Sequence, residues 1–249
     1  MKGVRKEAHP YFLYNVTMLY SLLFPRRCVS CRKAGEGYLC DGCFQSIHFN
    51  ETQYCPAVDC DKASLNGITH EGCQRKYDLD GHLSLTEYDD IMRSIIEFYK
   101  RRKVTKLESD LKDIIAYYFT EPESPFPFSL TQKPVVAAVP LFWIDQRLRG
   151  FNTAEQIGNL IARSLELSFS NQVLKKAKPT RSQKKLSKKE RSQNIQGSFE
   201  VVQNNMVDGK EFVIVDDIWT TGSTLRECAR VLKKAGASQV WGITLTKGI

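Results

Sequence analysis

The sequence predicts an α/β fold built on a mostly parallel sheet, preceded by a small domain that metal holds together. Two observations support this prediction. In the second half of the chain, short apolar runs typical of buried strands alternate with helical patterns, which is the order of a parallel sheet with helical crossovers. Near the start of the chain, seven of the eight cysteines lie between positions 28 and 73.

Composition excludes several classes of protein. The chain has 249 residues, of which 42% are hydrophobic and 26% charged, so it is globular rather than disordered or fibrous. Its net charge is +8, and residues 175–191 alone hold nine basic residues and one acidic residue. The rest of the chain is therefore neutral, which argues against a generally basic nucleic-acid coat.

The apolar stretch 11–24 near the N-terminus is 14 residues long, shorter than the ~18 residues that a membrane span needs. Pro25, Arg26 and Arg27 follow it, where a secretory signal would have small residues. We therefore expect residues 1–23 to form a helical or packing segment, and we expect a cytoplasmic protein without a membrane span.

The first four cysteines form two knuckles. Cys28 and Cys31 are separated by two residues, as are Cys40 and Cys43. Each such turn offers two thiolates on one side, and zinc is usually held by four ligands of this kind. Because all four positions would be filled by protein, we expect this Zn²⁺ to be structural.

A second set of metal ligands is less clear. Cys55, Cys60, His70 and Cys73 could close a Cys3His site. The four-residue gap between the first two is looser, however, and His70 could equally be a surface residue. The sequence therefore predicts one structural zinc and leaves a second open, in a metal-stabilised domain over residues 24–78.

Helices and strands follow in alternation. Ile91, Ile95 and Phe98 share one face of a predicted helix, and Thr105 and Glu108 read as a capping box that opens a second. The pattern further predicts strands at 135–139, 198–202, 212–215 and 239–246, and helices capped by Asn152 and over 224–234. Cys228 lies on the apolar face of the last helix and is predicted to pack in the core.

Residues 212–224 contain the most informative motif. A buried strand ends at Asp216 and Asp217, and a loop of hydroxyl residues and glycine then opens a helix. The free N–H groups of a helix start bind anions, and Gly222 allows close backbone approach. Two carboxylates beside a phosphate would repel it, so they must address something beyond it, such as a sugar diol. A phosphate and a diol together describe a ribose 5-phosphate.

This motif resembles the phosphoribosyl-diphosphate loop of type I phosphoribosyltransferases. From about Phe24 to Thr246 the chain is similar to the ComF family, bacterial proteins linked to DNA uptake, including its double zinc ribbon. Further matching segments are Val139-Pro140-Leu141, Arg149-Gly150-Phe151-Asn152, Gln183 through Leu186, Arg191 and Asn194. The family usually has a second C-x2-C pair where this chain has Cys55-x4-Cys60 and His70, which puts the second zinc in doubt.

The resemblance implies a Rossmann-like type I phosphoribosyltransferase core over residues 79–249, with a mobile basic loop at about 175–195. Asp216 and Asp217 would be catalytic and bind the ribose hydroxyls, directly or through Mg²⁺. The 5-phosphate would be bound by Thr220, Thr221, Gly222, Ser223 and Thr224. Arg147, Arg149 and Lys100 would contact phosphates, although all three could equally be surface charges at helix ends.

The basic segment has three interpretations. By family analogy, Arg181 and Arg191 would be catalytic and, with Gln183, Lys184 and Lys185, would close over the departing diphosphate. The cluster could instead bind DNA phosphates, although few aromatic residues interleave it for base stacking. It could also be a solvated run of charge.

Three functional hypotheses follow. The first is a phosphoribosyltransferase that uses phosphoribosyl diphosphate and an acceptor that the sequence does not specify. The second is a regulator that binds phosphoribosyl diphosphate without chemistry. The third is a non-catalytic accessory protein of DNA uptake. It would contact single-stranded DNA, the uptake motor or recombination-loading proteins through the zinc ribbon and the basic loop.

Overall fold

The computed structural model describes residues 26–35, 37–60, 62–101, 107–120, 133–180 and 187–248. The segment predicted over residues 1–23, Thr105 of the predicted capping box and Arg181 lie outside these residues.

A five-stranded parallel sheet forms the centre of the fold, in the order β3-β9-β8-β4-β5. In that order the strands span Gly81–Glu87, Gln239–Lys247, Glu211–Trp219, Val135–Ala138 and Ser168–Ser170. Every neighbouring pair is parallel, so the prediction of a parallel α/β sheet is confirmed.

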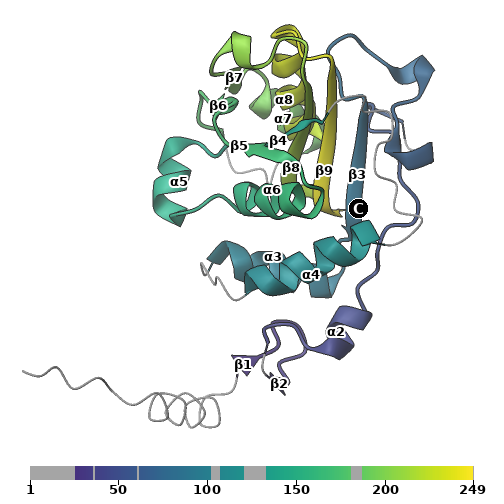
Figure 1. The fold of residues 1–249 in the computed structure, drawn as a ribbon, viewed down its shortest axis with the longest axis vertical. Coiled ribbons are helices and arrows are strands. Elements are labelled where there is room, and N and C mark those ends of the chain that lie inside the picture. Colours follow the sequence, from purple (N-terminus) through teal and green to yellow (C-terminus); the bar gives the residue numbers. More distant parts are fainter. Residues whose placement is uncertain are drawn as a thin grey trace, which may run out of the picture.

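Helices cover both faces of this sheet (Figure 1). One face packs against α3 (Asp90–Arg101), α4 (Leu107–Thr120) and α6 (Thr153–Ser164) in a single apolar cluster. The other packs against α8 (Ser223–Lys234), whose Cys228 is fully buried, as the sequence predicted. Burial on both faces explains why the central strands read as continuous apolar runs.

The cysteine-rich region begins with a short antiparallel pair, β1 (Arg26–Arg27) and β2 (Ala34–Gly35), followed by α2 (Asp41–Gln45). In Figure 1 these elements lie beyond α3 and α4, on the side away from the sheet. Cys28, Leu39 and Cys43 belong to the same apolar cluster as α3 and α4. Both of the first two knuckles are therefore packed onto the main core.

The structure corrects one boundary that matters for the site. The strand predicted to end at Val215 continues through Trp219 as β8, because β9 runs beside it and pairs with it as far as Lys247. Asp216 and Asp217 therefore lie within a strand rather than in the loop that follows it. Helix α8 begins one residue before the predicted start, at Ser223.

Other elements were not predicted from the sequence. These include strands β3 and β5, helix α5 (Trp143–Arg149) and strand β6 (Leu174–Lys176). The strand predicted at 198–202 is β7 (Phe199–Val201), which pairs antiparallel with β6 outside the main sheet.

The two ends of the basic segment have regular structure. Lys175 and Lys176 lie in β6, and residues after Ser187 form α7 (Lys188–Ile195). Helix α7 begins with a capping box in which the side chains of Ser187 and Glu190 bond each other's backbone N–H groups. Residues 181–186, which include Gln183, Lys184 and Lys185, lie outside the described residues.

Within the described ranges, no helix is both long and apolar enough to cross a membrane.

Candidate functional site

The two carboxylates of β8 lie in different surroundings. Asp217 forms an ion pair with Lys100 at the end of α3, with 2.7 Å between Oδ2 and Nζ. Asp216 accepts a hydrogen bond from the backbone N–H of Asp217. Burial, and then repulsion by Asp217, raises the pKa of Asp216 to about 7, although Lys100 and Lys176 act in the opposite direction. The carboxyl of Asp216 therefore titrates near neutral pH.

The loop after β8 turns sharply into α8. Gly222 caps the helix with φ of 69°, in the left-handed region that disfavours other residues. A Cβ at this position would lie 2.3 Å from the Trp219 ring, so only glycine fits. Thr221 and Ser223 bond each other through their hydroxyls at 3.0 Å, which brings these donors together at the helix start. The arrangement suits an anion.

The ring of Trp219 packs against this loop at Gly222. Its ring is 9% exposed and stacks on His82 of β3, with 3.9 Å between ring centroids. Burial, and then the charges of Lys247 and Arg226, lowers the pKa of His82 to about 3, so this imidazole is neutral. Its Nε2 lies 3.0 Å from the Thr244 hydroxyl. Trp219 therefore packs against β3 rather than facing solvent.

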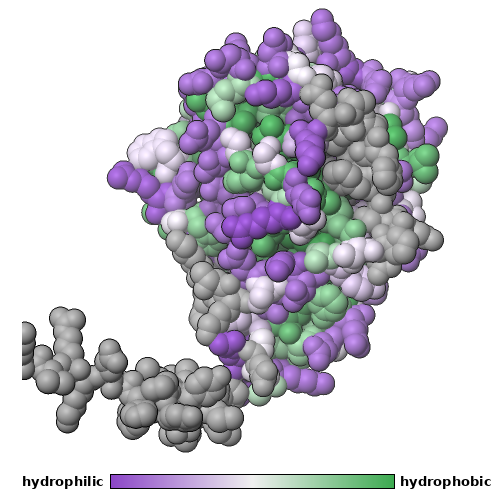
Figure 2. Space-filling model, viewed as in Figure 1, coloured by the Kyte–Doolittle hydropathy of each residue, from purple (hydrophilic) through white to green (hydrophobic). Residues whose placement is uncertain are grey.

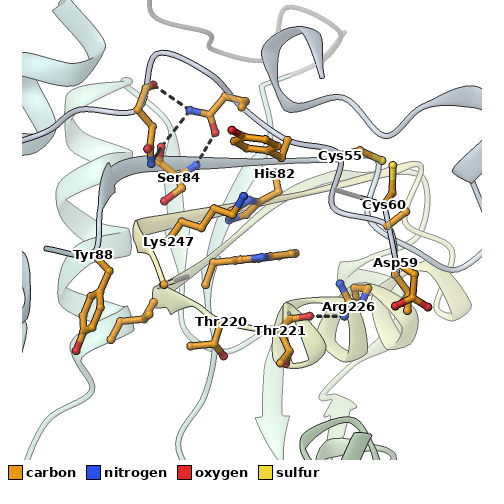
Figure 3. Close-up of a pocket in the computed structure, with 18 of the residues that line it drawn as sticks. Cys55, Asp59, Cys60, His82, Ser84, Tyr88, Thr220, Thr221, Arg226 and Lys247 are labelled. Carbon is orange, nitrogen blue, oxygen red and sulfur yellow. Dashed lines mark hydrogen bonds between the residues drawn. The ribbon is translucent and has the colours of Figure 1, made fainter. Parts of the chain in front are cut away.

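A cavity of about 950 Å³ opens beside the loop (Figure 3). Thr220 and Thr221 form one side of it, and residues 50–60 of the cysteine-rich region form another. Lys247 at the end of β9 also lines it, with its ammonium 3.7 Å from the centre of the Tyr54 ring. Arg191 of α7 lines the same cavity. The structure thus places Arg191 in the lining of the same cavity as Thr220 and Thr221.

The arginines of α5 lie apart from this cavity. Arg147 and Arg149 are exposed, and the guanidinium of Arg147 lies 6.0 Å from the centre of the Trp143 ring. Burial lowers the pKa of Lys176. The charge of Asp216 acts to raise this pKa, whereas that of Arg149 acts to lower it. Lys176 is thus close enough to both α5 and Asp216 to be influenced by their charges.

Sequence reasoning named neither Lys176 nor Arg226 as a site residue. Lys176 is one of nine basic residues between positions 175 and 191, and the sequence does not distinguish it from the others. Arg226 is simply one of several charges on α8, and its place beside the loop becomes visible only in the folded chain.

Both sets of metal ligands are assembled. One ligand atom from each residue of Cys28, Cys31, Cys40 and Cys43 lies within 4.8 Å of the others, and the same holds for Cys55, Cys60, His70 and Cys73. Neighbouring ligands in a tetrahedral zinc site are about 3.8 Å apart when the bonds are ~2.3 Å. The distances of 3.6 Å from Cys31 Sγ to Cys40 Sγ and from Cys60 Sγ to His70 Nδ1 fit that geometry.

His70 has the second contact expected of a zinc ligand. Its Nε2 lies 3.1 Å from the carbonyl oxygen of Ala63, which orients the ring and leaves Nδ1 facing the cysteines. Although Cys55 and Cys60 are more widely spaced in the sequence, all four ligands of the second set therefore meet in one cluster. Both clusters support zinc binding, and four protein ligands each make them structural in type.

Comparison with known proteins identifies both parts of the chain. Residues 151–248 match the family model described as phosphoribosyl transferase domain, and residues 19–75 match the double zinc ribbon domain. Competence protein F of Haemophilus influenzae is 29% identical over 88% of this chain and 97% of its own length. Over most of its length, the chain therefore resembles the ComF family. Competence protein ComFC of Bacillus subtilis is 26% identical over 88% of this chain and 83% of its own.

Other relatives match over a shorter region. The DNA utilization protein YhgH of Escherichia coli K12 is 33% identical over 45% of this chain and 49% of its own length. Among solved structures, the phosphoribosylpyrophosphate amidotransferase of B. subtilis covers 56% of this chain and 27% of its own, at 19% identity and a TM-score of 0.37. An adenine phosphoribosyltransferase from Thermoanaerobacter pseudethanolicus covers 66% and 88%, at 15% identity and a TM-score of 0.34.

Proposed function

We propose that this ComF-like protein binds phosphoribosyl diphosphate with Mg²⁺ in the cytoplasm and transfers phosphoribose to an acceptor, in a process linked to DNA uptake. The observation that carries the proposal is the order of groups along β8 and α8. Two carboxylates in different electrostatic surroundings precede a hydroxyl-rich turn at a helix start. The names of the relatives, competence protein and DNA utilization protein, support the link to DNA uptake.

Each group has a defined task in this proposal. Asp216 and Asp217 accept hydrogen bonds from the ribose hydroxyls or hold Mg²⁺, for which paired carboxylate oxygens are suitable ligands. The backbone and hydroxyls of Thr220–Thr224 bind the 5-phosphate. Lys100 holds Asp217 in place through their ion pair. When bound, Mg²⁺ would neutralise charge on the diphosphate.

Catalysis would then depend on charge stabilisation. Positive charge develops at the anomeric carbon as the diphosphate leaves, so no covalent nucleophile from the protein is needed. Arg147, Arg149, Arg181 and Arg191 are the arginines proposed to act on the departing group. The cavity beside Thr220 and Thr221 would receive the acceptor, with the cysteine-rich region as one of its walls.

Calorimetric titration with phosphoribosyl diphosphate and Mg²⁺ tests the proposal. We expect wild type to bind and the Asp216→Asn, Asp217→Asn double variant to lose binding at least a hundredfold. Asp113→Asn, an exposed change on α4, is the matched control and should bind as wild type. Failure of folded, zinc-loaded wild type to bind would overturn the proposal. Release of diphosphate upon adding acceptors separates an enzyme from a binding protein.

A second function is favoured by the charge of residues 175–191. Under this alternative the protein is non-catalytic and contacts single-stranded DNA, an uptake motor or recombination-loading proteins through the basic segment and the zinc ribbon. Binding of DNA should weaken steeply with salt and be reduced by the Lys184→Ala, Lys185→Ala double variant. No binding of DNA at low salt would exclude direct contact.

A further inference from the structure

Arg226 connects the second metal cluster to the loop that follows β8. Its Nη1 donates a hydrogen bond of 2.9 Å to the carbonyl oxygen of Pro56, the residue after the metal ligand Cys55. Its Nη2 donates to the carbonyl oxygen of Thr221, in the loop itself. Figure 3 shows the guanidinium between the side chains of Cys60 and Thr221. One planar group thus joins two segments 165 residues apart.

The same guanidinium also lies over the ring of Trp219. Its central carbon lies 5.7 Å from the centre of the Trp219 ring, a distance at which a cation is attracted to an aromatic face. Trp219 in turn lies against Gly222, where it fills the space that a side chain would occupy. Arg226 therefore contacts the loop both through a carbonyl group and through the ring that supports the loop.

We propose that Arg226 is a positioning residue that couples the second metal cluster to the phosphate-binding loop, so that metal bound by Cys55, Cys60, His70 and Cys73 sets the conformation of Thr220–Ser223. The ligand of the loop rests on the proposed function, whereas the coupling itself does not. The second cluster is therefore more than a local structural support, because its occupancy controls affinity for a phosphorylated ligand.

The physical basis is the geometry of arginine. Its fork presents two parallel donors at a fixed separation, whereas lysine offers one compact ammonium that cannot reach two carbonyl groups in the same way. Metal binding would fix the turn that follows Cys55, in which the N–H of Cys60 donates to the carbonyl oxygen of Ala57. Without metal, the Pro56 carbonyl loses its defined position and Arg226 loses one of its two anchors.

The first arm of the test leaves the metal ligands intact. Arg226→Lys keeps the positive charge but removes the fork. Arg230→Lys, one turn further along α8, is the matched control, because Arg230 pairs with Glu227 rather than with the loop. We measure amide hydrogen exchange of residues 219–223 without ligand, and the Kd for phosphoribosyl diphosphate with Mg²⁺. In Arg226→Lys we expect exchange at least tenfold faster and a Kd about tenfold higher, with the control within twofold of wild type.

The second arm removes one metal at a time. Cys60→Ser should disable the second cluster and Cys31→Ser the first, with loss of one zinc each checked by elemental analysis. We expect Cys60→Ser to match Arg226→Lys in both exchange and Kd, the combined variant to add less than twofold, and Cys31→Ser to leave both within twofold of wild type.

The coupling would be overturned if the Arg226→Lys variant had the same amide exchange rate and the same Kd as wild type. It would also be overturned if Cys60→Ser protein that has lost its zinc kept the wild-type exchange rate in residues 219–223. If Cys60→Ser does not fold, the Arg226→Lys arm decides alone. Should wild type bind no phosphoribosyl diphosphate, the proposed function fails, while the exchange comparison still tests the coupling.

Discussion

Asp216 and Asp217 show how two identical neighbours acquire different properties. Successive residues of a strand point in opposite directions, so the two carboxylates meet different surroundings. Asp217 pairs with Lys100 on α3, whereas Asp216 is subject mainly to burial and to the charge of Asp217. Its pKa of about 7 places the titration of this carboxyl in the physiological range.

This pKa predicts a pH-dependent affinity for the proposed ligand. Because the pKa of Asp216 is raised to about 7, its carboxyl becomes protonated as the pH falls through 7. At pH 8 the carboxyl is almost fully ionised. A ligand that needs the carboxylate should therefore bind about tenfold more weakly at pH 6 than at pH 8. Calorimetric titrations at pH 6, 7 and 8 in the presence of Mg²⁺ measure this difference.

Asp216→Asn is the control for titration of the ligand's own phosphates, which affects both proteins equally. The variant should bind weakly with a shallower pH profile. Parallel profiles for the two proteins would contradict the assignment of the titration to Asp216.

At the scale of elements, the start of α6 is tied to the end of β4. The buried Asn152 side chain accepts a hydrogen bond from the Ala154 N–H and donates one of 2.9 Å to the carbonyl oxygen of Val139. Val139 in turn donates its N–H to Val215 of β8. One cap thus fixes a helix, a strand end and, through β8, the approach to the carboxylates.

Replacing this cap should therefore cost more than replacing an exposed one. We expect Asn152→Ala to lower the free energy of unfolding by about 2–3 kcal/mol, because it removes a cap and leaves a buried carbonyl without its partner. Ser187→Ala, which removes the exposed cap of α7, should cost about 0.5–1 kcal/mol. Urea denaturation of the zinc-loaded proteins measures both, and equal losses would contradict the role of the bond to Val139.

At the scale of the whole molecule, the cysteine-rich region and the sheet share contacts. Tyr38, between the two knuckles, lies against Phe98 of α3, with 5.5 Å between ring centroids. The buried Gln53 bonds the backbone of Ser84 at the outer edge of β3 and the hydroxyl of Tyr118 on α4. These contacts protect the edge strand and join both regions.

We therefore predict that metal loss destabilises the whole molecule and not only the knuckles. Wild type should hold two zinc ions per chain and release them in the same thermal transition that unfolds the sheet. Removing them with a chelator should lower the transition by ~6–12 °C, as expected when about 3 kcal/mol is lost from a protein of this size. Circular dichroism with a zinc indicator dye records both events, and zinc release well below the unfolding of the sheet would contradict the prediction.

Sequence reasoning succeeded where the pattern is local and failed where it is not. The buried runs of β4, β8 and β9 were predicted because apolar residues on both faces mark them. Strand β3 was missed because its His82, Ser84 and Thr86 are polar, although all three are buried. Their partners come from distant parts of the chain, such as Thr244 for His82 and Gln53 for Ser84.

The sequence by itself determined the alternation of strands and helices, the ligands of the first metal cluster and the position of the loop after β8 at a strand-to-helix junction, because each depends on residues close together in the chain. Only the tertiary structure decided that Cys55 and Cys60 meet His70 and Cys73, that Asp216 and Asp217 differ, and that Arg226 contacts both the second cluster and the loop. These features depend on burial and on contacts between distant segments, which spacing along one chain does not specify.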